Sequence, residues 1–260
     1  MSKPSDVIPV SVFVVAQNEA TDLPQLLSSV KQFAEVIVVD SGSTDQTPQL
    51  AAQGGAKVLH QAWLGYAGQK QFALEQCKHD WVLNLDADEV VTPAMVTEIK
   101  RVIQQENIDA VRFSRNDSFI GRMPPSSIKK PNNVRLYRRK KAEFDTTQLV
   151  HETAKINGNV VKVETCFDHY GYDDIATLAT KLNTYSGLKA QQKFSRGKRG
   201  SILKLTLIVP VEFLRKLILQ RLIMFGRRGF ILAALNAYYA FLKEAKLVEL
   251  GMRSQDKKRE

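Results

Sequence analysis

Three acidic residues close together carry the most chemical information in this sequence. Asp86, Asp88 and Glu89 belong to the phrase Asn-Leu-Asp-Ala-Asp-Glu, which follows an apolar run, Trp81–Leu83, that predicts a buried strand. Two carboxylates at i and i+2 where a strand ends suit a hard divalent cation that carries a phosphorylated ligand. The alternative is a polar loop ahead of a helix that begins at Thr92, because a bare Asp-x-Asp pair also arises by chance.

Two more polar clusters follow predicted strands. Asn18 and Glu19 come after the run Val10–Ala16, and Asp40 ends the run Glu35–Asp40 ahead of a Ser/Gly turn. In open parallel sheets, ligands bind beyond the carboxyl ends of the strands. An Asp at such an end can accept from a base or ribose while the N–H groups of the turn approach the ligand. Asp40 alone could equally be a helix cap, but three such strand ends in order favour a ligand site.

The elements that must position these residues follow from hydrophobic periodicity. Between the first two apolar runs, apolar residues recur at helical spacing: Leu23, Leu26, Leu27, Val30 and Phe33. A second helix precedes a short strand at 56–59, and a third, over 66–78, precedes the strand at 81–85. This alternation predicts an α/β fold with a mostly parallel, Rossmann-like sheet and helices on both faces. From Ile108 onward shorter alternating strands follow.

Composition bounds the class of protein. The chain has 260 residues, 44% of them hydrophobic and 25% charged, which is ordinary for a globular protein. Cys77 and Cys166 have no metal-ligand spacing and no disulfide framework, so we expect a reducing cytoplasm. The N-terminal residues lack the apolar core of a secretory signal.

The basic charge is concentrated in the last third of the chain. Residues 1–177 hold 19 Lys/Arg against 22 Asp/Glu, whereas residues 178–260 hold 18 against 5. We therefore expect a nucleotide-binding catalytic domain over residues 1–173 and a basic, amphipathic helical region over 174–260. The net charge of +10 then comes entirely from residues 178–260, which we expect to bind an anionic partner.

An anionic membrane surface is the partner that this region favours. Leu203–Phe225 combines large aliphatic residues with basic ones, and Tyr238, Tyr239 and Phe241 could serve as interfacial anchors. The longest uncharged run, Gly229–Leu242, has 14 residues, fewer than the roughly 20 needed to span a bilayer. Alternatively, these helices pack on the catalytic domain or form a homodimer. Nucleic acid is not expected, because the basic residues accompany aliphatic rather than stacking aromatic side chains.

Three motifs together resemble a known family. The segments VFVVAQNEA, EVIVVDSGSTDQT and GQKQFALEQCKHDWVLNLDADE are similar to those of the family 2 inverting glycosyltransferases of GT-A fold, over roughly residues 9–170. Within that family the chain resembles the bacterial lipopolysaccharide-core branch, including heptose-directed glucosyltransferases. This finer resemblance depends on Val150-His151-Glu152, on His169-Tyr170-Gly171-Tyr172 and on the basic tail.

The resemblance implies a role for each strand-end residue. Asn18 and Glu19 would lie beside the nucleotide, and Asp40 would contact the uracil or ribose. Asp86 would approach the ribose and the cation, and Asp88 would be the direct ligand of Mg²⁺ or Mn²⁺ at the donor diphosphate.

Lys70, on the predicted helix before that strand, could reach the phosphates, although a solvated helix lysine is the alternative. The Gln-x-x-Arg-Trp motif of processive synthases is absent, which favours addition of a single sugar.

Inverting transfer also needs a carboxylate that deprotonates the acceptor hydroxyl. Glu152, after an apolar run, is the candidate base, and Asp117 and Asp145 are the alternatives. His151 or His169 could complete the metal shell, because neutral imidazole suits Mn²⁺ better than Mg²⁺. A lone histidine, however, is more often structural.

The resemblance thus implies an enzyme that moves one hexose, glucose by analogy with that branch, from a UDP-sugar to a lipopolysaccharide-core or other lipid-linked acceptor. It would act in the cytoplasm, peripherally on the inner face of the bacterial inner membrane. One alternative is a sugar-phosphate nucleotidyltransferase, which should carry a Gly-rich basic loop after its first strand, where this chain has Gln-Asn-Glu-Ala. The other is a non-catalytic membrane-binding adaptor.

Overall fold

The computed structural model describes residues 7–146, 153–171 and 174–256, and the chain forms two compact units. The first unit comprises Met1–Asn116 and Pro131–Tyr170, and the second comprises Asp117–Lys130 and Gly171–Glu260. The second unit therefore takes in a segment from the middle of the chain as well as the C-terminal helices. Glu152 and His151 lie outside the described residues.

The first unit is built on a sheet whose first four strands are parallel. They are β1 (Ile8–Ala16), β2 (Phe33–Asp40), β3 (Lys57–His60) and β4 (Trp81–Asp86), in the order β3-β2-β1-β4. β1 lies between β2 and β4, with Ala16 opposite Asp40 and Val15 opposite Asp86. The predicted parallel sheet is confirmed, and its three polar strand ends meet at one edge.

Antiparallel strands extend this sheet beyond β4. β7 (Asn132–Arg138) pairs with β4, and β6 (Ala110–Asp117), β10 (Val160–His169) and β5 (Glu89–Val90) follow in that order. A separate two-stranded sheet joins β8 (Ala142–Glu143) to β9 (Lys155–Ile156). The shorter strands expected after Ile108 therefore make the sheet mixed.

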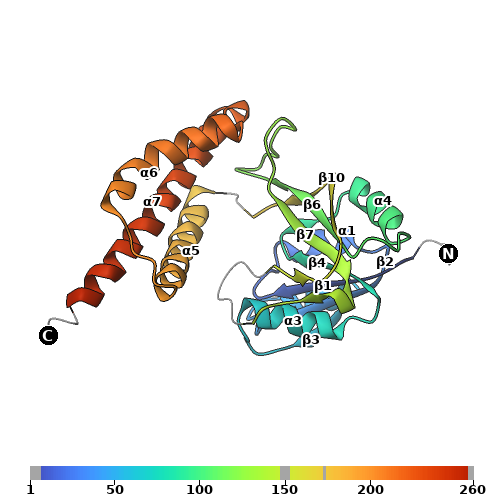
Figure 1. Cartoon of the computed structure of the whole chain (residues 1–260). Helices are drawn as coiled ribbons and strands as arrows, with labels where there is room; N and C mark the ends of the chain where they lie inside the picture. The colour runs from blue at the N-terminus through green and yellow to red at the C-terminus, as the bar shows by residue number, and fades with distance from the viewer. Residues whose placement is uncertain (1–6, 147–152, 172–173, 257–260) are drawn as a thin grey trace. The chain divides into compact units, whose positions relative to one another are not determined.

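Helices cover both faces of the sheet, as predicted (Figure 1). Alternate side chains of β1 point to opposite faces, so Val12 and Val14 enter one core while Phe13 enters the other. The first core is closed by α1 (Leu23–Ser29), α2 (Thr47–Gln53) and α4 (Pro93–Val102), and the second by α3 (Tyr66–Gln76).

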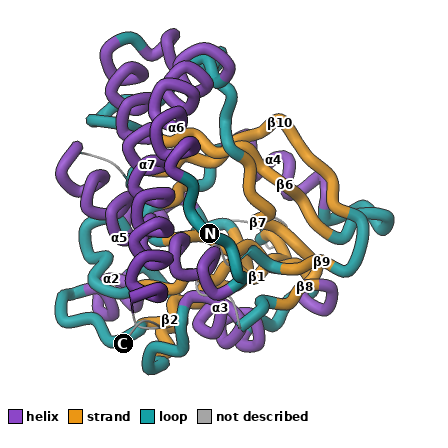
Figure 2. Tube along the Cα trace, turned by 60° about the vertical axis from the view of Figure 1, so that its left-hand side comes forward, coloured by secondary structure: helices purple, strands orange, loops and turns teal. Residues whose placement is uncertain are grey.

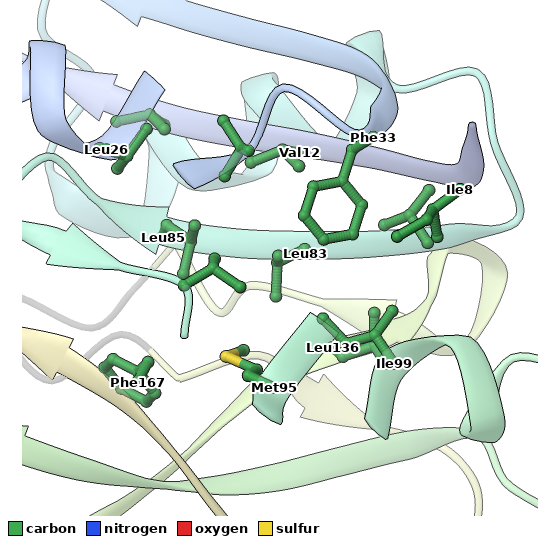
Figure 3. Packing of buried hydrophobic residues seen from close by; sticks show 14 of the residues in the cluster. Ile8, Val12, Leu26, Phe33, Leu83, Leu85, Met95, Ile99, Leu136 and Phe167 are labelled. Atoms are coloured by element: carbon green, nitrogen blue, oxygen red, sulfur yellow. The ribbon is translucent and has the colours of Figure 1, made fainter. Parts of the chain in front are cut away.

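Figure 3 shows how the first core fills. Met95 and Ile99 of α4 lie near the strand residues Leu83 and Leu136, and all four are fully buried. Thr92 caps α4 by accepting a hydrogen bond from the backbone N–H of Met95, which confirms the helix start predicted there. The core therefore holds β4, and with it the acidic phrase, in a fixed position.

The second unit is helical. α5 (Ile175–Ser195) and α6 (Ile202–Leu214) both pack along α7 (Arg227–Asp256), as Figure 2 shows. Between α6 and α7 lie a π-helical turn, η2 (Arg215–Leu219), and a 3₁₀ turn, η3 (Leu222–Phe225). In the part of the chain that the structure describes, no helix is both long and apolar enough to cross a bilayer.

Candidate active site

The loops that follow β1 and β2 are tied to each other by hydrogen bonds. The Asn18 N–H donates to Ser43 Oγ at 2.9 Å, and Asn18 Oδ1 accepts from the Thr44 N–H at 2.8 Å. The Glu19 N–H donates to Thr47 Oγ1 at 2.8 Å. Asn18 has a φ of +58°, a left-handed conformation that asparagine adopts more readily than most residues. The two loops therefore form one polar rim beyond the sheet.

Asp40 is a buried acceptor within that rim. Its carboxylate accepts from the N–H groups of Gly42 at 3.1 Å and Ser43 at 3.2 Å, and His60 Nδ1 lies 3.5 Å away. Gly42 has a φ of +94°, which permits this tight turn. Burial alone would raise the pKa of Asp40, but the hydrogen bonds from Ser43 and Gly42 outweigh it and hold the pKa below its ordinary value. Asp40 thus shapes the turn as an ionised group.

Asp86, at the end of β4, faces two cations. Lys70 Nζ lies 2.9 Å from its Oδ1 and Arg135 Nη2 lies 2.7 Å from its Oδ2. The Asp86 side chain is 43% exposed, whereas those of Lys70 and Arg135 are only 10% and 8% exposed. Burial opposes ionisation here, yet Arg135 and Lys70 hold the pKa of Asp86 well below its usual range. Lys70 is therefore buried and ion-paired with Asp86, unlike the solvated lysine of the alternative interpretation.

Arg135 belongs to the cluster around Asp86, and sequence reasoning missed it. It lies on β7, and its Nη2 also donates to Glu89, which is fully buried. Its Nη1 donates to Asn84 Oδ1 at 3.3 Å, and its guanidinium lies 5.5 Å from the centre of the Phe167 ring. A single cation between apolar residues of a strand was the available signal, because an isolated buried charge needs a partner.

The Glu89 side chain is fully buried and contacts the Asp86 backbone. Its Oε2 accepts from the Asp86 backbone N–H at 3.1 Å. Burial raises the pKa of Glu89 to about 7; the charge of Asp86 adds to this effect, and the charge of Arg135 opposes it. Of the three acids Asp86, Asp88 and Glu89, Glu89 is therefore the fully buried one, and it fixes the backbone at the end of β4.

Asp88 and His169 form a second pair beside this cluster. Asp88 Oδ2 lies 3.2 Å from His169 Nε2, with the two side chains 19% and 9% exposed. The pairing of β5 with β10 sets His169 opposite Glu89, and the Tyr170 N–H donates to the Asp88 carbonyl at 2.9 Å. A carboxylate oxygen and an imidazole nitrogen this close fit a cation such as Mn²⁺ whose other ligands come from phosphate and water. Among the described residues, no three His, Cys, Asp or Glu side chains form a ready metal cluster.

Of the three candidate bases, the structure describes Asp145 and Asp117. Asp145 is paired with Lys155 Nζ at 2.8 Å within the first unit, and Asp117 is counted in the second unit. The assignment of Glu152 as the base stays a prediction, as does that of His151 as a metal ligand.

Known proteins match this chain along most of its length. Residues 11–162 match the model of glycosyl transferase family 2. The lipopolysaccharide core biosynthesis glycosyltransferase LpsC of Rhizobium meliloti is 37% identical over 250 residues, which cover 93% of each chain. An uncharacterized glycosyltransferase of Rickettsia bellii is 36% identical, covering 96% of this chain and 91% of its own. A crystal structure of S. aureus TarS, residues 1–349, superposes with a TM-score of 0.51 at 19% identity, covering 95% and 92%, and shows the likeness of fold alone.

The sheet, its flanking helices and these matches define the protein as a glycosyltransferase with a GT-A-like α/β fold. More particularly, the chain belongs to glycosyl transferase family 2, as the family model and the LpsC relative both show. The resemblance drawn from the three motifs is thereby confirmed. Neither the nucleotidyltransferase nor the non-catalytic adaptor interpretation agrees with this membership.

Proposed function

We propose that this enzyme transfers one hexose, with glucose preferred, from a UDP-sugar to a lipopolysaccharide-core or other lipid-linked acceptor, with inversion at the anomeric carbon. The observation that carries the proposal is the cluster around Asp86 and Asp88, which joins paired acids to the buried cations Lys70 and Arg135 and to His169. The printed name of the LpsC relative supports the acceptor class. The strongly basic second unit agrees with an acceptor that lies at an anionic surface.

The donor nucleotide would occupy the rim formed by the first two loops. Asp40, an ionised acceptor beside the N–H groups of its turn, suits the uracil or ribose hydroxyls. Asn18 and Glu19 are held against the second loop and would border the nucleotide. Asp86, next along the sheet edge, would approach the ribose.

Lys70 would change partner when the donor binds. In the structure its ammonium group lies 2.9 Å from Asp86 Oδ1, in a nearly buried position. A diphosphate carries more negative charge than one carboxylate, so it would attract this cation strongly. Arg135 would then remain with Asp86 and keep that carboxylate ionised.

Mg²⁺ or Mn²⁺ is the cofactor that these side chains fit. Asp88 and His169 would hold it, and Asp86, already balanced by two cations, would contribute less. When bound, the ion supplies charge neutralisation for the diphosphate leaving group.

The transfer itself is an in-line displacement. The acceptor hydroxyl oxygen bonds to the anomeric carbon as the bond from that carbon to the diphosphate oxygen breaks. We propose Glu152 as the base that takes the hydroxyl proton, and the UDP product leaves with the electron pair of the broken bond. Lys70 would stabilise the negative charge that develops on the departing phosphate.

A donor panel with purified protein tests the proposal. UDP-glucose, UDP-galactose and their N-acetyl forms are offered with and without Mn²⁺, with delipidated core oligosaccharide or Kdo-lipid A as acceptor, and the anomeric configuration of the product is read by NMR. We expect transfer of a single sugar with inversion. It should be lost in Asp88→Ala, and in Glu152→Gln it should be lost while UDP-sugar binding persists. Retained turnover in Glu152→Gln would reject that base, and a product with retained configuration would reject the mechanism.

A further inference from the structure

Large apolar side chains are exposed along α6 and the turns that follow it. We call this the α6 surface, and its members are each 41–71% exposed: Ile202, Leu203, Leu207, Val209, Val211, Leu214, Ile218, Leu219, Ile223 and Met224. Scattered single apolar residues are normal on a protein surface, but so many along one helix and the turns after it indicate an interaction site.

The α6 surface follows from helical geometry. Leu203, Leu207, Val211, Leu214 and Ile218 recur at i, i+4, i+8, i+11 and i+15, which places them on one continuous stripe. Because the helix is also apolar on its other side, it can bury only one of its two apolar faces within the protein. The stripe is therefore left for another partner.

The opposite side of α6 is packed within the second unit. The Phe213 ring meets the Phe230 ring of α7 edge to face, with centroids 5.2 Å apart. Phe213 and Leu217 also border a small core that includes Leu222 and Ala233. This packing fixes which side of the helix faces outward.

The start of α6 is held by an ionic contact. Glu244 of α7 is 1% exposed and accepts from the Ser201 N–H at 3.1 Å and from Lys204 Nζ at 2.7 Å. A buried carboxylate with these two donors resists rotation of α6, because rotation would leave the charge unpaired. The α6 surface cannot turn inward without breaking this contact.

Basic residues outnumber acidic ones in the segment that carries the α6 surface. Between Ile202 and Arg228 there is one acidic residue, Glu212, and it is already paired with Arg215 at 2.6 Å. The basic residues of this segment are six: Lys204, Arg215, Lys216, Arg221, Arg227 and Arg228. Exposed apolar side chains among basic ones match an interface of acyl chains and anionic headgroups.

We infer that the α6 surface inserts into the headgroup region of an anionic membrane, with α6 lying in the plane of the interface. The inference rests on the proposed function, since a lipid-linked acceptor is presented at such a surface. The proposed membrane contact is therefore the α6 surface and not the whole basic region 174–260. A symmetric homodimer through the same surface is disfavoured, because it would bring two sets of six basic residues together.

Vesicle binding by the full-length chain tests the inference. Co-sedimentation is measured with vesicles of phosphatidylcholine alone and with equal parts of phosphatidylcholine and phosphatidylglycerol. Leu207→Glu and Met224→Glu should each weaken binding to the mixed vesicles by roughly tenfold, because an inserted apolar group is lost and a like charge is added. Both side chains are more than half exposed, so we expect the fold to persist, and circular dichroism checks this.

Met252→Glu is the matched control. Met252 lies on α7 outside the α6 surface and is 59% exposed, the same as Met224. Equal losses in Met224→Glu and Met252→Glu would overturn the inference, as would equal binding of the unmodified chain to neutral and anionic vesicles.

Two further measurements separate the remaining outcomes. Light scattering without lipid should show the same mass for the unmodified chain and for Leu207→Glu; a dimer that Leu207→Glu converts to a monomer would assign the surface to a second copy. UDP-sugar hydrolysis in lipid-free buffer should be unchanged in both variants. Lost vesicle binding with retained hydrolysis supports the membrane assignment, whereas absent hydrolysis in every form would count against the proposed function alone.

Discussion

Arg135 on β7 and Asp86 at the end of β4 form an ion pair of 2.7 Å, and the same guanidinium nitrogen also binds Glu89. A strand far along the chain therefore supplies the charge that balances two acids of one short phrase. Lys70 provides a second cation for Asp86 from the side of α3. The ionised state of Asp86 on β4 therefore depends on cations from α3 and β7.

Replacement of Arg135 tests this dependence. In Arg135→Met, Asp86 keeps its pair with Lys70, but Glu89 is left buried without its guanidinium partner. Breaking a buried pair in this way costs roughly 3–5 kcal/mol of unfolding free energy. Urea unfolding followed by circular dichroism measures the loss. Arg101→Met, which removes an exposed pair with Glu98 on α4, is the control and should leave the midpoint unchanged; similar shifts in both variants would contradict the prediction.

Glu89 should impose a pH dependence on stability. Because burial raises its pKa from 4.5 to about 7 in the folded chain, the folded chain holds a proton between these values that the unfolded chain has lost. The contribution of Glu89 is therefore fully present below pH 4.5, and it is lost as the pH rises through about 7. Glu89→Gln cannot titrate, so this fall in stability should flatten.

Urea midpoints of the unmodified chain and Glu89→Gln, measured between about pH 5 and about pH 7.5, check the difference in slope. Asp86 has the opposite sign, since its lowered pKa makes its contribution disappear as the pH falls below 3.8, outside this window. Parallel slopes in the two proteins would show that Glu89 does not titrate there.

Metal dependence should trace to Asp88 and His169. If both hold the cation, Asp88→Asn should lower UDP-sugar hydrolysis by roughly 10²–10³-fold. His169→Gln should raise the Mn²⁺ concentration for half-maximal rate by roughly tenfold while the rate at saturating metal changes less. Chelation followed by metal titration measures both effects. His79→Gln, two residues before β4, should behave like the unmodified enzyme. An unchanged metal requirement in His169→Gln would show that His169 is not a metal ligand.

Lys70 should act on donor binding more than on folding. Lys70→Met removes the cation proposed to meet the diphosphate, while Arg135 still balances Asp86. KM for the UDP-sugar should rise roughly tenfold or more, with a smaller fall in kcat, because one charged contact is worth about that factor. Steady-state kinetics give the two constants. Lys78→Met, whose side chain is 76% exposed beside Glu35, should change neither.

Local patterns were enough to predict the parallel strands of the first unit and the start of α4. The runs that became β1, β2 and β4 are strongly β-branched or apolar, and α4 has its own Thr92 cap, so each element is specified by nearby residues. Parallel pairing then requires that Asn18, Asp40 and Asp86 end at the same sheet edge. Family membership followed from the same short motifs, since they contain those three strand ends.

The partners of these residues depended on the tertiary structure. Arg135 is nearly 50 positions from Asp86 in the chain. No local pattern predicts that β7 pairs antiparallel with β4, or that the Arg135 guanidinium then pairs with Asp86 and Glu89. His169 meets Asp88 only because β10 pairs with β5. In the second unit, composition predicted a basic amphipathic region. The contacts of Phe213 and Glu244 with neighbouring residues determine which face of α6 stays exposed. Side-chain type follows from the sequence, whereas the environment that sets charge, pKa and exposure comes from segments distant along the chain.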